Sequence, residues 1–177
     1  MNRSLRTWAR VAVPLAAAAV ASVLAVPTAT ATTPAETTAT TPAETAATTV
    51  TCYDNPCITG IRAATHTGYD RLVFDLTAPT RIFGTSTNTT GAYTPMSGLT
   101  EYVTVKGTSY LFITMEPAHL ASGVEWSKAF GLPTIKGVQL TNFHAARAEF
   151  GLSLGPSTRY NVFHLTQPDR VVVDVYR

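Results

Sequence analysis

A seven-residue pattern that occurs twice constrains the fold of this chain more than any other feature. Its first copy runs from Asp70 to Leu76 (DRLVFDL), and its second runs from Asp169 to Val175 (DRVVVDV). Four of the seven positions are identical in the two copies, and the other three are apolar in both. Segments this rich in β-branched and aromatic residues favour strands. The repeat therefore predicts two strands of the same design within one β-rich fold.

The side chains of each copy separate into a core face and an outer face. Successive side chains of a strand point to opposite faces, so the third, fifth and seventh residues of each copy share one face. These apolar residues are expected in the core: Leu72, Phe74, Leu76, Val171, Val173 and Val175. We expect the two strands to occupy equivalent positions, related by a pseudo-two-fold axis.

The outer face of each copy carries an Arg and an Asp four residues apart. Four residues of a strand span about 13 Å, so the Arg and Asp of one strand cannot pair with each other. If the strands are antiparallel neighbours, Arg71 faces Asp174 and Asp75 faces Arg170, with the two central valines opposed. If they lie in different sheets, each charge pairs elsewhere. The four charges are either structural ion pairs or members of a functional site, and both alternatives remain open.

The N-terminal 31 residues are typical of a secretory signal peptide. Three arginines precede an apolar stretch of 16 residues (11–26), and Ala29-Thr30-Ala31 matches a signal-peptidase site. The apolar stretch is shorter than the roughly 20 residues that span a bilayer. We therefore expect cleavage after residue 31, no stable membrane insertion of the mature chain, and a secreted protein that the cell wall could retain.

Residues 32–50 consist almost entirely of Thr, Ala, Pro and Glu, and the sequence TPAET occurs in them twice. Such a segment has too little apolar bulk to offset the entropy of ordering, which predicts a disordered tether. From residue 32 onward the chain has ten Lys and Arg and eleven Asp and Glu, a net charge of −1. Without a basic cluster, a nucleic-acid partner is not expected.

Residues 51–177 have the length of one domain, and almost every local signal in them is typical of strands. Eight or nine short strands predict an all-β fold, which we expect to be a pseudo-symmetric sandwich of two sheets. Other segments carry narrower expectations: an exposed loop over 85–98, a tight hairpin joining strands 101–106 and 109–115, an irregular stretch with one helical turn over 117–133, and a hairpin turn at 155–157.

Cys52 and Cys57 are the two cysteines of the chain. An exported protein meets oxidising conditions, so a disulfide between them is the expected state. The four residues between them favour a turn, which makes the bond a small staple at the start of the domain. Their spacing suits neither a redox pair nor a zinc site.

The two repeat segments, Gly68 to Leu76 and Pro168 to Val175, resemble the AMIN-like domain of actinobacterial exported proteins. That family is related to the AMIN module attached to cell-wall amidases and secretion pores. The resemblance covers roughly Cys57 to Arg177. It implies a β-sandwich of two similar sheets and a non-catalytic role at the cell envelope, usually described as peptidoglycan binding. No catalytic domain accompanies the module in this sequence.

The sequence contains no motif that indicates catalysis, a cofactor or a metal. The histidines and cysteines form no H-E-x-x-H or C-x-x-C pattern, and no serine lies in a G-x-S-x-G elbow. Asp75 and Asp174 are the one pair of acids that could suit glycoside hydrolysis, but structural ion pairs are the more frequent role of such residues. We therefore expect no catalytic residues, no metal ligands and no cofactor.

Two functions from different classes remain. The first is a secreted, non-catalytic module that binds peptidoglycan or another glycan of the wall. The second is an exported protein-interaction or inhibitor domain that docks an envelope protein through a loop or an edge strand. The residues expected to bind a ligand are Tyr69, Arg71, Trp126 and Arg170. Trp126 has an alternative role, because a loop tryptophan can instead plug one end of the sandwich.

Overall fold

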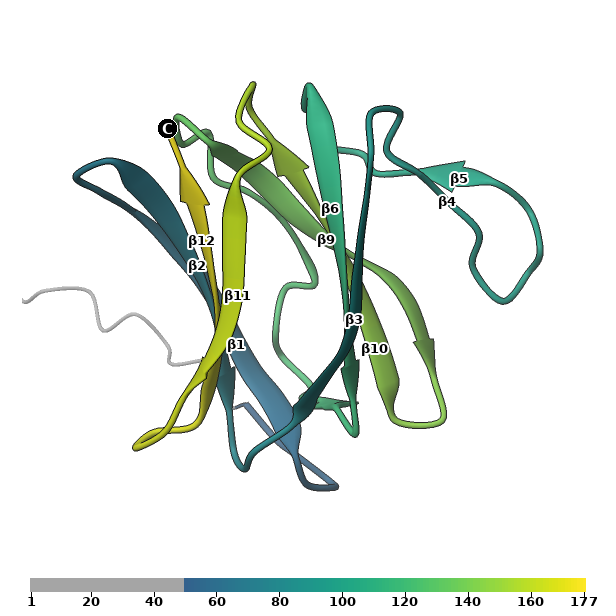
Figure 1. Ribbon diagram of the computed structural model, residues 1–177. Coiled ribbons are helices and arrows are strands. Elements are labelled where there is room, and N and C mark those ends of the chain that lie inside the picture. The colour runs from purple at the N-terminus through teal and green to yellow at the C-terminus, as the bar shows by residue number, and fades with distance from the viewer. Residues whose placement is uncertain (1–49) are drawn as a thin grey trace, which may run out of the picture. The chain divides into compact units, whose positions relative to one another are not determined.

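The computed structural model describes residues 50–177. The predicted signal peptide (1–31) and all but the last residue of the predicted tether (32–50) lie outside the described residues. The described residues form two five-stranded sheets and a two-stranded ribbon (Figure 1). The strands are β1 (Cys57–His66), β2 (Tyr69–Leu76), β3 (Arg81–Asn88), β4 (Ala92–Tyr93), β5 (Glu101–Tyr102), β6 (Ser109–Glu116), β7 (His119–Leu120), β8 (Ser127–Ala129), β9 (Ile135–His144), β10 (Arg147–Leu154), β11 (Tyr160–Leu165) and β12 (Arg170–Tyr176). The predicted all-β sandwich is confirmed.

The first sheet has the strand order β11-β12-β2-β1-β7, with the two repeat strands at its centre. β2 and β12 are antiparallel neighbours, and their register places Arg71 opposite Asp174 and Asp75 opposite Arg170. Val73 lies opposite Val172 at the midpoint. The neighbour arrangement, one of the two alternatives left open by the sequence, is therefore the correct one.

A local two-fold relates the two halves of this sheet. β1 and β2 form one antiparallel hairpin, and β11 and β12 form a second, so the repeat strands meet in the middle and their partners lie outside them. The axis passes between Val73 and Val172. The predicted pseudo-symmetric placement of the two repeats is thus confirmed within the first sheet.

The second sheet has the order β3-β6-β10-β9-β8, and the core lies between the two sheets (Figure 1). The six predicted core residues are all buried: Leu72, Phe74, Leu76, Val171, Val173 and Val175. From the opposite sheet, the ring of Phe150 on β10 meets that of Phe74 with centroids 4.8 Å apart. Burial of these apolar faces is the main favourable term in folding a sandwich of this kind.

Asp70, the first residue of the first repeat, links the two sheets through hydrogen bonds. Its fully buried carboxylate accepts hydrogen bonds from the amide and the hydroxyl of Thr134, at 2.5 and 2.8 Å, and from the amide of Ile135 at 3.2 Å. The hydroxyl of Thr65 and the guanidinium of Arg177 donate to its other oxygen. A buried carboxylate is tolerated when donors surround it in this way.

The predicted hairpin between 101–106 and 109–115 is wrong. The strand at this point is only Glu101–Tyr102 (β5), and it pairs with β4 rather than with β6. The next residues cross the outer face of the second sheet, because Val103 and Val105 pack where Gly151 and Gly137 leave room. A Cβ atom at either glycine would lie 2.8 Å from a valine methyl.

Three other local expectations also change. The loop predicted over 85–98 is shortened, because β3 continues to Asn88 and its threonines suit a strand paired with β6. The stretch 117–133 contains the short strands β7 and β8 and no helical turn. The turn at 155–157 does not close a hairpin, since β10 belongs to the second sheet and β11 to the first.

Candidate functional site

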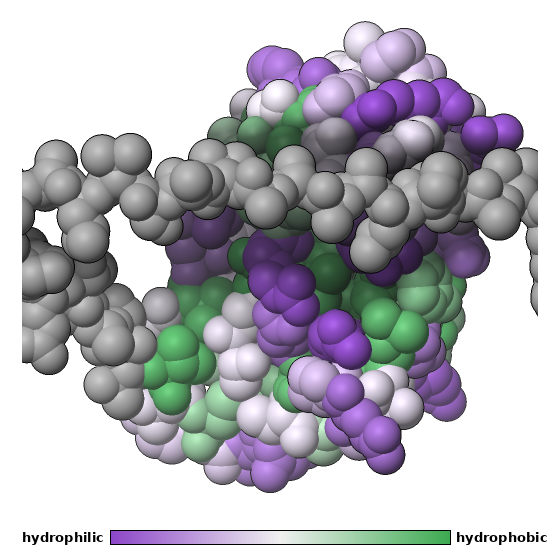
Figure 2. All heavy atoms as spheres, turned by 90° about the vertical axis from the view of Figure 1, so that its left-hand side faces the viewer, coloured by the Kyte–Doolittle hydropathy of each residue, from purple (hydrophilic) through white to green (hydrophobic). Residues whose placement is uncertain are grey.

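The outer face of the first sheet brings together three of the four predicted ligand-binding residues. Tyr69 and Arg71 on β2 and Arg170 on β12 alternate with core residues and so share the outer face. This side of the molecule faces the viewer in Figure 2, where the visible part shows hydrophilic and hydrophobic residues interspersed.

Arg71 lies at the centre of this face and is held on several sides. Its Nε and Nη2 atoms donate to the two carboxylate oxygens of Asp174 at 2.7 and 2.8 Å. The carboxylate raises the pKa of Arg71 above its ordinary value, chiefly through these hydrogen bonds. The guanidinium carbon lies 5.3 Å from the ring centroid of Tyr69 and 5.6 Å from that of Phe163. Such a bidentate and stacked arginine has little freedom of orientation.

Three aromatic rings form a row beside Arg71. His66, Tyr69 and Tyr176 are register partners across β1, β2 and β12. The rings of His66 and Tyr69 stack with centroids 4.9 Å apart and an interplanar angle of 13°. The centroids of Tyr69 and Tyr176 are 5.9 Å apart, and the guanidinium of Arg159 lies over the Tyr176 ring at 5.1 Å. The row offers a partly exposed apolar surface next to charged donors.

Asp75 and Arg170 oppose each other in the register but do not form the expected ion pair. Asp75 instead accepts two hydrogen bonds from Arg62 of β1, both at 2.9 Å. Arg170 donates to the carbonyl of Pro168 at 3.1 Å. The local two-fold explains the asymmetry, because Phe163 on β11 takes the position that Arg62 holds on β1.

A shallow hollow of about 150 Å³ lies in this face between Arg62, Ala64, His66 and Arg71. It exists because the small side chain of Ala64 lies between longer neighbours on β1 and β2. Asp75 and Asp174, the two acids considered for glycoside hydrolysis, are each bound by an arginine in this region.

Trp126, the fourth predicted ligand-binding residue, does not join the other three. It precedes β8 at the edge of the second sheet, and its carbonyl accepts a hydrogen bond from the amide of Leu140. Its ring packs against the core, with a centroid 6.2 Å from that of Phe150, and it remains half-buried. The geometry corresponds to the alternative in which Trp126 plugs the sandwich.

The outer face of the second sheet is partly covered by the segment that contains the β4–β5 ribbon. The ring of Tyr93 packs on Phe112, and its hydroxyl donates to Glu101 at 2.9 Å. Burial raises the pKa of Tyr93 to about 12, and the bond to Glu101 adds to this effect. Gln139 on β9 joins the ribbon segment to the sheet through Tyr93 and Thr104.

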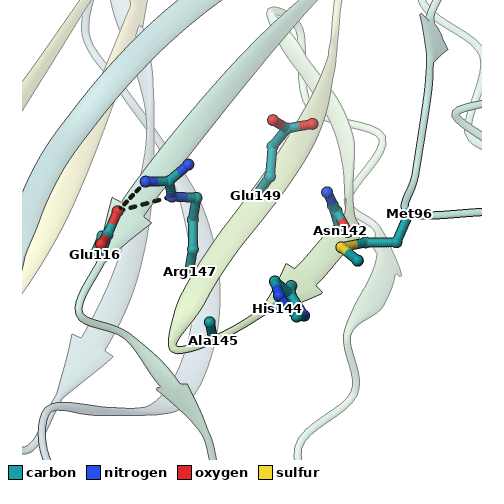
Figure 3. A pocket seen from close by; sticks show the side chains of 7 residues that line it. All are labelled: Met96, Glu116, Asn142, His144, Ala145, Arg147 and Glu149. Carbon is teal, nitrogen blue, oxygen red and sulfur yellow. Dashed lines mark hydrogen bonds and ion pairs between the residues drawn. The ribbon is translucent and has the colours of Figure 1, made fainter.

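The uncovered part of this face contains a polar hollow of about 310 Å³ (Figure 3). Its wall is formed by β6, β9, β10, the β9–β10 turn and the loop between β4 and β5 (residues 94–100), which we call the ribbon loop. The residues are Met96, Glu116, Asn142, His144, Ala145, Arg147 and Glu149. Arg147 pairs with Glu116, with Nη2 and Oε2 2.6 Å apart. Within residues 50–177, no three His, Cys, Asp or Glu side chains are grouped closely enough to hold a metal ion.

The expected Cys52–Cys57 disulfide is present. It links the start of the described chain to β1. Nearby, Asn55 accepts a hydrogen bond from Thr77, and Asp54 approaches His119 at 3.8 Å. The bond therefore lies at the β1–β7 edge of the first sheet and contributes no side chain to either hollow.

Several residues that the fold places at these surfaces were not among the predicted ligand-binding residues. A two-residue turn at Thr67-Gly68 is the sequence signal that could have identified His66, because it places His66 opposite Tyr69. Alternation with period two from Arg170 could have identified Tyr176 as a residue of the same outer face. No local pattern could have joined Met96 to Glu149, because the ribbon loop reaches β10 only through tertiary packing.

Comparison with known proteins agrees with the architecture. No curated protein matches the chain. The model of the AMIN-like domain family matches residues 56–177, which is most of the chain and nearly all of the part that the structure describes. AMIN-like domains are generally non-catalytic binding modules associated with the cell wall. With its two sheets, its paired terminal repeats and this match, the chain belongs to the AMIN-like domain family.

Proposed function

We propose that this protein is an exported, non-catalytic module that binds a glycan of the cell wall, peptidoglycan being the first candidate. Family membership supports a role at the wall. The observation that carries the proposal is the row of His66, Tyr69 and Tyr176 beside the fixed guanidinium of Arg71. Sugar rings pack their apolar faces on aromatic side chains, while arginines donate to hydroxyl and carboxylate oxygens.

The charges of this face favour a ligand that carries acidic groups. Arg62 and Arg71 are neutralised by Asp75 and Asp174. Arg170 instead donates to the backbone carbonyl of Pro168, and no acidic side chain of the described residues pairs with it. The positive charge of Arg170 therefore remains on the face, and its attraction to an acidic polymer should weaken as salt screens it.

The test is co-sedimentation of the purified protein with cell-wall sacculi, followed over time by an assay for soluble fragments. We expect retention above that of a control protein and no release of fragments. Tyr69→Ala should weaken retention, whereas Tyr102→Ala, at an exposed aromatic residue of the β4–β5 ribbon, should not. Steady release of soluble fragments would contradict the proposal that the module is non-catalytic. Asp75 and Asp174 would then be the first acids to replace.

The second candidate, a protein-interaction or inhibitor domain, has one structural feature in its favour. β3 is an eight-residue strand at the edge of the second sheet, and only β6 pairs with it among the described strands. An extended segment of a partner could add to such an edge. Failure to sediment with sacculi, together with capture of an envelope protein that Thr85→Pro abolishes, would favour this function.

A further inference from the structure

The hollow on the second sheet combines groups of both charges around one space. Glu116 on β6, Arg147 and Glu149 on β10 and Asn142 on β9 point to the same outer face, and Met96 closes the side nearest the ribbon loop (Figure 3). Its volume of about 310 Å³ is at the lower end of the range of ligand pockets. The hollow is separated from Tyr69 and Arg71 by the whole thickness of the sandwich.

The charges in the hollow do not cancel. Glu116 is neutralised by Arg147, whose Nε donates to it at 2.7 Å. The carboxylate of Glu149 receives hydrogen bonds from the hydroxyls of Thr141 and Thr114, at 3.1 and 3.4 Å. Hydroxyl groups orient a carboxylate but leave its charge in place. No basic side chain of residues 50–177 forms an ion pair with Glu149, so one negative charge faces the hollow.

Arg147 is fixed and still has a donor to offer. Its Nε and Nη2 atoms both contact Glu116, and its guanidinium carbon lies over the Phe83 ring, 4.2 Å from the ring centroid. Figure 3 shows the third nitrogen, Nη1, pointing away from Glu116. The hollow therefore presents an anion on one side and an N–H donor on another.

A second depression of about 340 Å³ adjoins this hollow and shares Met96 and Asn142 with it. Its wall has an apolar part, formed by Pro95, Leu140 and Phe143, and a polar part, formed by Ser97, Glu101 and Thr141. Met96 and Phe143 are 64% and 42% exposed, so both have apolar surface that a ligand could cover. A ligand that spans both depressions would have a charged end and an apolar side chain.

We propose that the hollow binds an α-ammonium group that lies next to a carbonyl or carboxylate oxygen and carries an apolar side chain. The ammonium binds Glu149 and the amide oxygen of Asn142. The neighbouring oxygen accepts a hydrogen bond from Arg147, and the side chain lies against Met96 and Phe143. This chemistry has two sources, a free amino acid and the N-terminus of a peptide. The site does not depend on wall binding by the opposite sheet.

The test is titration of the isotope-labelled protein with leucine, leucinamide and N-acetylleucine, followed by NMR. We expect leucine and leucinamide to shift the signals of the β9–β10 hairpin and the Asn142 side-chain amide, and N-acetylleucine to leave them unchanged. Equal affinity for the first two compounds assigns a peptide N-terminus, whereas much tighter binding of leucine assigns a free amino acid. Either result supports the proposal.

Variants make the test specific. Glu149→Gln should weaken leucinamide binding about tenfold or more, because it removes a charged hydrogen bond, and Asn142→Leu should also weaken it. The matched control Glu125→Gln, at an exposed residue outside the hollow, should leave affinity unchanged. The spectrum of each variant shows directly whether it is folded. Shifts of equal size with N-acetylleucine, or no shift with leucinamide up to about 50 mM, would overturn the proposal.

Discussion

The guanidinium of Arg71 donates two hydrogen bonds to the carboxylate of Asp174, which lies on the adjacent strand and in the second copy of the same motif. The two residues are 103 positions apart in the chain. Asp174 is almost completely buried, with its side chain 7% exposed, whereas that of Arg71 is 29% exposed. The pair therefore joins the second and the last strands of the domain at the centre of the first sheet. It also fixes the position of Arg71 on the outer face of that sheet, where we propose that a glycan binds.

Removing Arg71 should destabilise the domain, because it leaves the buried carboxylate of Asp174 without its charged partner. We expect Arg71→Ala to lower the free energy of unfolding by about 2–3 kcal/mol, less than for a fully buried pair because Arg71 is partly solvated. A double-mutant cycle with Asp174→Asn, measured by chemical denaturation, should give a coupling energy of at least about 1 kcal/mol. Additive effects would contradict the pairing.

Phe74 should be among the most sensitive positions of the core. It is fully buried and packs against Phe150 of the opposite sheet, so Phe74→Ala would leave a cavity between the two sheets. We expect a loss of about 3–5 kcal/mol in the free energy of unfolding. Tyr53→Ala is the matched control, because Tyr53 is 84% exposed and should change stability little.

The stability of the domain should fall in acid in a way that depends on Asp70. Burial alone would raise the pKa of this carboxyl, but the donors from Thr134, Thr65 and Ile135 outweigh it and hold the pKa below its ordinary value. A folded-state pKa below that of the unfolded chain contributes stability above about pH 4, the ordinary value. That contribution is lost as the pH falls through the lowered folded-state pKa.

Denaturation curves between pH 5 and pH 2 would test this linkage. Asp70→Asn should be less stable than the natural protein at neutral pH and should lose less stability on acidification. Thr134→Val removes one of the donors, so it should move the acid-induced loss to higher pH. An Asp70→Asn protein that loses as much stability in acid as the natural one would show that other carboxyls dominate.

Retention on sacculi should depend on Arg170 through its charge. Arg170 donates only to a backbone carbonyl of its own turn, so Arg170→Gln should disturb the fold little. We expect this variant to bind the wall several-fold more weakly than the natural protein at low salt. The difference should shrink as salt increases, because screening weakens the interaction of exposed charges. A deficit that persists unchanged in high salt would point to a role other than charge.

The centre of the fold was predictable from sequence because the repeat carries its own register. An Arg and an Asp four residues apart, in two antiparallel copies, bring opposite charges together only when the central valines face each other, and Val73 does oppose Val172. The partner of Asp75 was not predictable, since Arg62 lies outside the repeat. The hairpin expected at Gly107-Thr108 failed because packing of Val103 on the sheet overrides local strand propensity.

The two candidate sites also differ in how much of each could be predicted from the sequence. Tyr69, Arg71 and Arg170 could be placed on one face from alternation within the repeats alone. Trp126 was a candidate because it lies in an irregular segment, and sequence cannot show that such a ring packs inward. The hollow around Glu149 depends on contacts between the ribbon loop and the second sheet, which are distant in sequence and carry no local signature.

The turn between β9 and β10 should be a position where stability can be gained. Ala145 and Ala146 connect the opposed residues His144 and Arg147, and both adopt positive φ angles, 48° and 60°. Two-residue hairpin turns of this kind favour Asn-Gly, because Asn and Gly tolerate the left-handed region better than alanine does. Replacing Ala145 by Asn and Ala146 by Gly should therefore relieve backbone strain.

We expect the double variant Ala145→Asn, Ala146→Gly to raise the free energy of unfolding by about 1 kcal/mol, measured by chemical denaturation. The backbone strain that is relieved at the two left-handed alanines should exceed the stability that is lost because glycine raises the conformational entropy of the unfolded chain. Ala64→Gly on β1 is the matched control, since Ala64 has no positive φ and the change should destabilise by about 0.5–1 kcal/mol. Changes of opposite sign in the free energy of unfolding of the two variants would establish that the turn is strained. Equal losses of stability in both would contradict this prediction.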